Sequence, residues 1–195
     1  MHKGRIEAFS DGVIAIIITI MVLEMKVPHG TDLAALKPLV PVFGSYVLSF
    51  VYVGIYWNNH HHLFQAVKHV RGGVLLANLH LLFWLSLLPF VTGWMGENHF
   101  APTPVMLYGA VLLMAALAYT ILVRTLLASH GGDSALARAI GSDRKGNASL
   151  ALYVAGMATA WWLPWLAVAI FSAVAVIWLM PDRRIERSLH HDAQG

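Results

Sequence analysis

Long apolar runs without a single charged side chain dominate this chain. Four such runs cover residues 38–67, 72–96, 98–123 and 146–181. A helix that crosses the hydrocarbon core of a bilayer needs about 20 apolar residues, so each run is long enough to cross. The last run has 36 residues, and one helix of that length would reach roughly 54 Å against a core of about 30 Å. It is therefore predicted to fold back at Trp161–Trp165, where Pro164 breaks the helix and tryptophan prefers the membrane interface.

An isoleucine-rich segment before the first of these runs completes the set of predicted helices. Together the segments predict six transmembrane helices, over residues 6–27, 36–58, 73–95, 104–126, 147–162 and 164–180. No Gly/Ser-rich linker and no low-complexity tract divides the chain. We therefore expect an all-α integral membrane protein in which residues 1–195 form a single six-helix domain.

The composition and the distribution of charge place these helices in a membrane and orient them. With 58% hydrophobic and 12% charged residues and a mean hydropathy of +0.65, the chain has too little polar surface to cover a soluble globule of this size. Eleven of the 13 lysines and arginines fall on one side of the predicted helices, and only Lys26 and Lys37 fall on the other. Because cations in short loops stay cytoplasmic, both chain ends are predicted to be cytoplasmic. The net charge of +3 then reflects membrane insertion and predicts no nucleic-acid partner.

The first predicted helix has the feature most typical of a functional site in a membrane. Asp11 stands at the mouth of the isoleucine-rich span, and ionisable groups at that depth are costly. A cleaved signal peptide is the alternative reading, because Lys3 and Arg5 precede the apolar stretch. Glu7 and Asp11 would add negative charges to the part of a signal peptide that is normally basic, and residues 24–28 contain no small-residue cleavage site. We therefore expect a permanent transmembrane helix.

Enzymatic alternatives find little support in the residues. His60–His62 fall at the end of the second predicted helix, but adjacent helical residues point about 100° apart and cannot chelate one ion. Retinal binding needs a lysine inside a span, whereas Lys26 and Lys37 lie at the rim. The chain has no cysteine, and no Ser-His-Asp set or Gly-rich phosphate loop can be read from it. We expect neither an enzyme nor a resident metal or cofactor.

The first helix offers two equally regular apolar faces. Ile16, Ile20 and Leu23 fall at i, i+4 and i+7, with Thr19 at the edge of this stripe. A second set follows the same period, namely Ile14, Ile17, Ile18 and Met21. Periodicity alone does not decide which face meets the neighbouring helices.

Motifs of polar and aromatic residues mark the first three predicted helices. The first helix has Arg5-x3-Phe9-Ser10-Asp11-Gly12, followed by Leu23-Glu24-x-Lys26-Val27-Pro28. The second ends with Trp57-x2-His60-His61-x-Leu63-Phe64, and the third contains Asn78-Leu-x-Leu-Leu-Phe83 and then Leu87-Leu88-Pro89-Phe90. In this combination the chain resembles the TMEM175 family of potassium channels. The motifs cover the first half of the chain, and the second half matches by helix count alone.

The resemblance implies a potassium-selective, leak-type cation channel that has no Thr-Val-Gly-Tyr-Gly filter, and this chain has no such loop. Six-helix units of that family assemble around an axis lined by their first helices, so a chain with one unit is expected to form a homotetramer in the cell membrane. The Phe-Ser-Asp motif assigns the constricting isoleucine to Ile16 and its neighbouring threonine to Thr19, and Ile20 and Leu23 extend the neck. Expected partners are lipid, other copies of the chain and monovalent cations, with permeant potassium rather than a cofactor.

The remaining motif residues are expected to position the first helix rather than to meet the ion. The resemblance gives this scaffold role to Arg5, Phe9, Ser10, Asp11 and Gly12. It also implies partners for the motif on the second and third helices, among Trp57, His60, His61 and Asn78. The pairing of these side chains stays open at this level.

Two other classes of membrane protein compete with a channel. A small secondary transporter of a cation or metabolite is expected to have inverted repeats and helices broken near the midplane. No clear repeat is visible. Prolines lie near span ends at residues 28, 38, 41, 164 and 181, and Pro89 is the exception. A non-conducting structural protein is the other class. No span has the repeated arginines of a voltage sensor, so gating by membrane potential is not expected.

Overall fold

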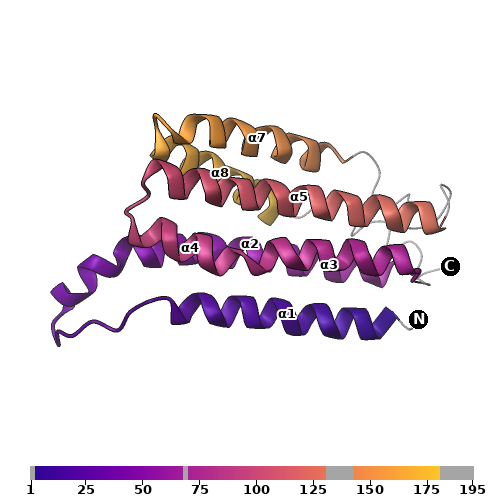
Figure 1. The fold of residues 1–195 in the computed structure, drawn as a ribbon, viewed down its shortest axis with the longest axis horizontal. Coiled ribbons are helices and arrows are strands. Elements are labelled where there is room, and N and C mark those ends of the chain that lie inside the picture. The colour runs from indigo at the N-terminus through magenta and orange to yellow at the C-terminus, as the bar shows by residue number, and fades with distance from the viewer. Residues whose placement is uncertain (1–2, 68–69, 131–142, 181–195) are drawn as a thin grey trace.

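The computed structural model describes residues 3–67, 70–130 and 143–180, and its regular elements are helices. They are α1 (Lys3–Leu23), the 3-10 helix η1 (Leu33–Leu39), α2 (Val40–Gln65), α3 (Gly72–Ser86), α4 (Leu88–Glu97), α5 (Pro102–His130), α7 (Arg144–Ala160) and α8 (Pro164–Leu179). Figure 1 shows the long helices side by side along the longest axis of the molecule. The predicted all-α class is confirmed.

The position of α1 within this bundle matters most for function. α1 lies at one edge and α7 at the opposite edge, with α2, α3 and α4 between them (Figure 1). α1 packs against α2, α3 and α4, whereas α5 joins α3 and α4 to α7 and α8. α1 therefore has one side that is packed within the chain and one side that is open.

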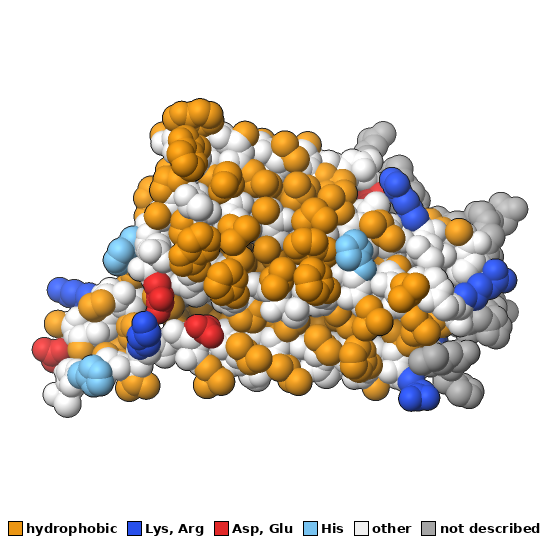
Figure 2. All heavy atoms as spheres, viewed as in Figure 1, with side chains coloured by type: hydrophobic (Ala, Val, Ile, Leu, Met, Phe, Trp, Pro, Cys, Tyr) orange, Lys and Arg blue, Asp and Glu red, His pale blue; other side chains and the backbone are white. Residues whose placement is uncertain are grey.

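Helix length and surface chemistry both fit a multi-pass membrane protein. Among the described residues, four helical stretches are long and apolar enough to cross a bilayer, namely Lys3–Leu23, Leu33–Gln65, Gly72–Glu97 and Pro102–Ser129. α7 and α8 are shorter, with 17 and 16 residues, and each extends about 25 Å. On the face shown in Figure 2, apolar side chains cover the middle, and lysines and arginines gather toward the two ends.

The second predicted helix, 36–58, differs most from the structure, because α2 begins at Val40 and continues to Gln65. The preceding residues form η1, and Pro41 lies in the first turn of α2, where its missing N–H breaks no helical bond. At the other end, His61 and Gln65 hydrogen-bond across one helical turn at 2.8 Å. The triplet His60–His62 therefore lies inside α2, close to its end, with His62 in the last turn. α1 is also shorter than predicted and ends at Leu23, not at residue 27.

Pro89 divides the third predicted helix into two segments. Proline has no N–H to donate to the carbonyl four residues earlier, so the regular helical pattern is interrupted. α3 ends at Ser86 and α4 begins at Leu88, and Leu87 bridges them by donating to the Trp84 carbonyl at 3.3 Å. The two segments remain one apolar stretch from Gly72 to Glu97.

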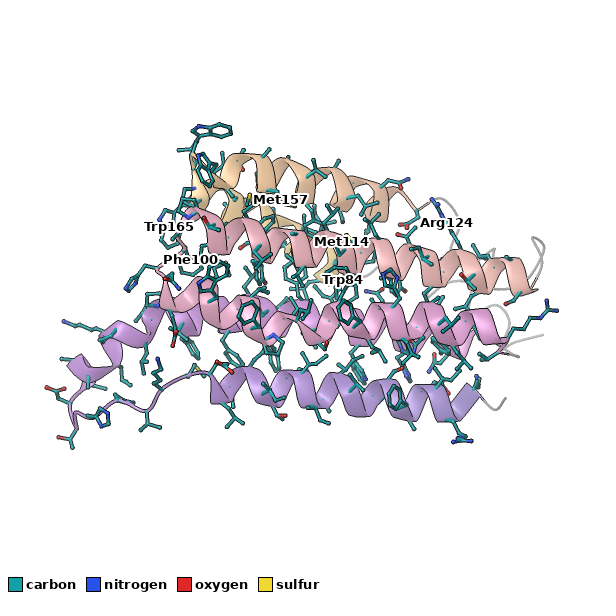
Figure 3. All side chains as sticks on the ribbon, viewed as in Figure 1. Trp84, Phe100, Met114, Arg124, Met157 and Trp165 are labelled. Atoms are coloured by element: carbon teal, nitrogen blue, oxygen red, sulfur yellow. The ribbon has the colours of Figure 1, made fainter. Side chains whose placement is uncertain are left out.

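The predicted reversal at the tryptophan cluster forms the turn between α7 and α8. Leu163 donates to the Thr159 carbonyl at 2.8 Å just before Pro164 starts α8. Figure 3 shows Trp165 beside Phe100, with ring centroids 4.7 Å apart. Phe100 has a φ of 59°, in the left-handed region that bulky residues avoid, and its ring is buried. Contact with Trp165 thus holds the turn between α4 and α5 in a conformation that sequence propensity disfavours.

α2 and α4 approach each other closely at Gly96. A Cβ added there would lie 2.7 Å from the Cα of Val42, which belongs to the backbone of α2 and cannot rotate away. A glycine is therefore required at this crossing because a side chain would separate the two helices.

Gly96→Ala is expected to lower the free energy of unfolding by about 1–3 kcal/mol, because the added methyl group overpacks the crossing. Thermal unfolding of the purified protein in detergent measures the effect. Gly54→Ala is the matched control, since a Cβ at Gly54 meets no atom within 4 Å, and it should be neutral or slightly stabilising. Equal stability of the two variants would contradict the close approach.

Candidate functional site

The structure distinguishes the two apolar faces of α1 that periodicity leaves equivalent. Ile14 and Ile17 are 2% and 3% exposed, and they form part of the core with α2, α3 and α4. On the other face, Ile16, Ile20 and Leu23 are 58%, 41% and 78% exposed. No helix in the described part of the chain covers this second face. We call the stripe of Ile16, Ile20 and Leu23 the open face of α1.

Thr19 lies beside this stripe, and its hydroxyl hydrogen takes part in a hydrogen bond within α1. Its Oγ1 donates to the Ile16 carbonyl at 2.9 Å, within the helix. The side chain is exposed, and a hydroxyl oxygen that donates still has lone pairs to offer. Thr19 therefore presents an acceptor oxygen on an otherwise apolar surface.

A buried series of hydrogen bonds joins α1 to α2 and α3. His60 Nε2 donates to Asn78 Oδ1 at 2.8 Å, and Asn78 Nδ2 donates to Ser10 Oγ at 2.9 Å. Because an amide oxygen can only accept, the Nε2 atom of His60 holds the hydrogen in this arrangement. All three side chains are buried, and the His60 ring stacks on Phe64 with centroids 4.5 Å apart. We call this series the Ser10–Asn78–His60 ladder.

Asp11 has a different partner from Ser10. Trp57 Nε1 donates to Asp11 Oδ1 at 3.0 Å on an exposed part of the surface. The His61 ring stacks on the Trp57 ring, with centroids 5.9 Å apart. Of the four partners suggested for the motif, Trp57 thus bonds Asp11 and Asn78 bonds Ser10, while His60 bonds Asn78.

The other residues of the motif lie at the surface of the single chain. Arg5 and Phe9 are exposed, and a Cβ added at Gly12 would meet no atom within 4 Å. Nearby, Lys3 Nζ donates to the carbonyls of Phe64 and Gln65 at 3.3 and 3.4 Å. A lysine suits this position because the last carbonyls of a helix attract cations.

An ion pair that sequence reasoning missed lies at the Leu23 end of α1. Lys26 Nζ is 2.8 Å from Glu97 Oε1 at the end of α4. The hydrogen bond from Lys26 to Glu97, together with the attraction of that carboxylate, raises the pKa of Lys26. No spacing in the sequence signals this pair, because its members are on different helices far apart in the chain.

A groove of about 590 Å³ is lined by residues of α1, α3 and α4. Ile16 and Ile20 line one side, Phe90 and Trp94 line the other, and Glu24 lies near the Lys26 end. The Glu24 side chain sits over Gly93, where an added Cβ would come within 3.5 Å of its carboxylate. The open face therefore adjoins a groove with a carboxylate at one end.

The sequence profile of the family described as endosomal/lysosomal potassium channel TMEM175 matches residues 5–89. A potassium channel of Chryseobacterium sp. strain P1-3 is 58% identical over 189 residues, which cover 97% of this chain and 98% of that protein. The chain belongs to the TMEM175 family. Its relatives are ion channels, so this TMEM175 protein is not an enzyme.

Two further relatives of this TMEM175 protein show how far the similarity extends. The crystal structure of a lysosomal potassium-selective channel TMEM175 homolog from Chamaesiphon minutus matches with a TM-score of 0.78 and 28% identity, over 91% of this chain and 96% of that one. The human endosomal/lysosomal proton channel TMEM175 is 41% identical over 96 residues, which are 43% of this chain and 19% of the human protein. The fold is therefore shared over nearly the full length with a bacterial relative.

The histidines of this TMEM175 protein do not form a metal centre in the described part of the chain. Within residues 3–67, 70–130 and 143–180, no three His, Asp or Glu side chains lie close enough together to hold an ion. His60 is instead part of the Ser10–Asn78–His60 ladder.

Asn78→Leu is expected to lower the free energy of unfolding by about 1–3 kcal/mol, because His60 and Ser10 then lose their buried partner. Thermal unfolding in detergent, followed by fluorescence, measures the change. Asn58→Leu provides the same substitution at an exposed position of α2 and should have little effect. If both variants unfold at the wild-type temperature, the ladder does not stabilise the packing of α1.

Proposed function

We propose that this TMEM175 protein is a potassium-selective leak channel of the cell membrane, in which four copies surround a central pore lined by α1. The observation that supports this most is the open face of α1, an uncovered apolar stripe on a helix whose opposite face is packed against three others. The potassium channel of Chryseobacterium, which matches over nearly the full length, supports the same assignment. In this proposal the whole chain is one six-helix channel domain.

The proposed selectivity arises at a ring of four Ile16 side chains. An apolar neck favours dewetting, so an ion passes only when the neck widens or the ion loses part of its hydration shell. Potassium loses water at a lower cost than sodium does, and an apolar neck therefore favours potassium without a ring of carbonyls. Ile20 and Leu23 extend this neck. The β-branched isoleucines stiffen its wall because they have few rotamers.

Thr19 offsets part of the cost of dehydration in this mechanism. Its hydroxyl hydrogen is bonded to the Ile16 carbonyl, so the oxygen lone pairs point away from that bond and suit a cation. Four such oxygens beside the isoleucine ring provide a partial substitute for water.

The residues of the first motif set the position of α1 in this proposal. Residues on a helix are about 100° apart, so a rotation of half that angle would replace Ile16 at the axis by its neighbours. The Ser10–Asn78–His60 ladder opposes such a rotation from less than two turns away. The contact of Asp11 with Trp57 also opposes this rotation of α1. Arg5, Phe9 and Gly12 lie on the exposed side and are proposed to meet neighbouring copies.

The cations orient this channel with both chain ends in the cytoplasm. The described lysines and arginines near the start of α1, the start of α3, the end of α5 and the start of α7 outnumber Lys26 and Lys37 at the opposite end. Leu23 and Glu24 then mark the outer end of the pore, where a carboxylate attracts cations.

Ile16→Asn is expected to reduce the preference for potassium over sodium several-fold, because a polar ring retains water in the neck. The measurement is ion flux from liposomes loaded with potassium or sodium and containing purified protein. Ile121→Asn is the matched control, since Ile121 is 45% exposed on α5, and it should leave the preference unchanged. An unaltered preference in Ile16→Asn would refute the proposed neck.

Native mass spectrometry of the protein released from detergent should give a complex of four chains. A monomer under conditions that retain potassium flux would exclude a central pore between copies.

Unitary currents in planar bilayers separate the channel from its main alternative. A pore gives discrete current steps, whereas a small secondary transporter of a cation or metabolite gives slow, saturating flux without steps. A pH-sensitive dye inside the liposomes tests proton flux as well, because the human relative bears the name of a proton channel.

A further inference from the structure

A small cavity lies between α2, α5, α7 and α8, away from α1. Tyr56 and Asn59 of α2 line it, whereas the intervening neighbour Trp57 contacts Asp11 of α1. The cavity has a volume of about 40 Å³, and one water molecule needs roughly 10–15 Å³ by this measure. The cavity therefore has room for a ligand of about three heavy atoms.

Tyrosine rings form much of the wall of this cavity. Tyr52 and Tyr56 come from α2, Tyr119 from α5 and Tyr153 from α7. Tyr56 and Tyr119 meet edge to face with centroids 6.2 Å apart, and Tyr52 and Tyr153 are 6.3 Å apart. Aromatic faces attract cations through their quadrupoles.

The two side-chain nitrogens that line the cavity each donate one hydrogen bond within the protein. Asn59 Nδ2 donates at 2.8 Å to the carbonyl one turn earlier in α2, and Trp178 Nε1 donates to Ser149 Oγ at 2.8 Å. A second amide hydrogen of Asn59 remains, but the Asp143 carboxylate in the same wall repels an anion.

Several oxygens in the same wall retain acceptor capacity. The Thr120 hydroxyl donates to the Ala116 carbonyl at 2.9 Å, and the Tyr119 hydroxyl donates to the Asn59 carbonyl at 3.3 Å, so lone pairs remain on both oxygens. The Asn59 Oδ1 atom is an acceptor as well. This arrangement favours a ligand that donates hydrogen bonds.

Besides the aromatic wall and its acceptor oxygens, the hydroxyl of Tyr56 also indicates a ligand site. Its side chain is only 8% exposed, and its hydroxyl has no hydrogen-bond partner within the described residues. Every fully buried side-chain nitrogen or oxygen in that part of the chain does have a partner. The Tyr56 oxygen is therefore not fully buried, and the residue lines the cavity.

Among the described residues that line the cavity, Asp143 is the one with a formal charge. Its Oδ1 accepts from the Gly146 N–H at 2.8 Å and caps the start of α7. Asp143 is exposed to solvent, and its Oδ2 can accept hydrogen bonds from a cation in the cavity that the residue lines. The nearby Lys145 ammonium donates to the Met180 carbonyl at 3.0 Å and does not line the cavity.

We propose that this cavity binds a small alkylammonium cation, with its charged group between Tyr56, Tyr119 and Asp143. An alkylammonium donates hydrogen bonds to the free oxygens and presents methyl groups to the rings. Sodium is held more strongly by water and gains little from a mainly aromatic wall. The proposal concerns a face of α2 about 100° away from Trp57 and His60, so it is separate from the proposed pore.

The test uses methylammonium chloride and the purified protein in detergent. Methylammonium replaces sodium at constant ionic strength, and binding is followed by saturation-transfer NMR of the methyl group and by the shift in Tm. Wild-type protein should show saturable binding with a stabilising shift. Absence of saturable binding, which means a cavity that holds water only, would overturn the proposal, as would an equal shift with potassium.

Asp143→Asn removes the charge and keeps the fold, because asparagine caps a helix as well as aspartate does. Its Kd for methylammonium should rise at least fivefold. Asp32→Asn is the matched control, since Asp32 caps η1 in the same way by accepting from the Ala35 N–H, and its Kd should not change. Equal Kd values for Asp143→Asn and wild type would overturn the proposal.

Tyr56→Phe removes only the hydroxyl without a partner and should also weaken binding. Ile16→Asn separates this site from binding in the pore, because it changes the proposed neck and leaves the cavity intact. Its Kd should equal that of wild type, and a changed Kd would assign the methylammonium to the pore.

Discussion

The Ser10–Asn78–His60 ladder is the constraint on which the arrangement of α1 depends. A polar side chain inside a membrane protein must find a partner, and here each of three buried polar groups finds it on another helix. Satisfying all three fixes the rotation of α1 against α2 and α3 together. With that rotation set, Ile14 and Ile17 enter the core, and Ile16 and Ile20 are left outside it.

An uncovered apolar stripe has a different meaning in a membrane from its meaning in water. On a soluble protein it would mark an interface or an aggregation hazard, whereas on a membrane helix lipid can cover it at no cost. The exposed Thr19 beside the stripe, the Glu24 carboxylate at its end and membership of the TMEM175 family together favour a pore. The Lys26–Glu97 pair ties the chain that follows α1 to α4 at the same end.

α2 connects the two halves of the molecule. One face of it bonds α1 through Trp57 and α3 through His60, and a neighbouring face presents Tyr56 and Asn59 to the cavity with α5, α7 and α8. The second half is closely packed, as the Phe171 ring lies where a Cβ of Gly109 would be only 2.5 Å away. The contact of Phe100 with Trp165 joins the two halves again at the far end.

The helical class, the membrane setting and the reversal at Pro164 follow from the sequence, because charge-free runs and helix-breaking residues are local properties of a chain. The sequence predicted less well that α2 continues to Gln65 and that the third helix divides at Pro89. Both features depend on hydrogen bonds between neighbouring turns, such as His61 with Gln65 and Leu87 with Trp84. Tertiary structure alone decided which apolar face of α1 is buried, and that Ser10 rather than Asp11 joins Asn78. Periodicity orders the side chains around one helix, but a face is buried only when partners from other helices reach it, and those partners lie up to 68 residues away in the chain.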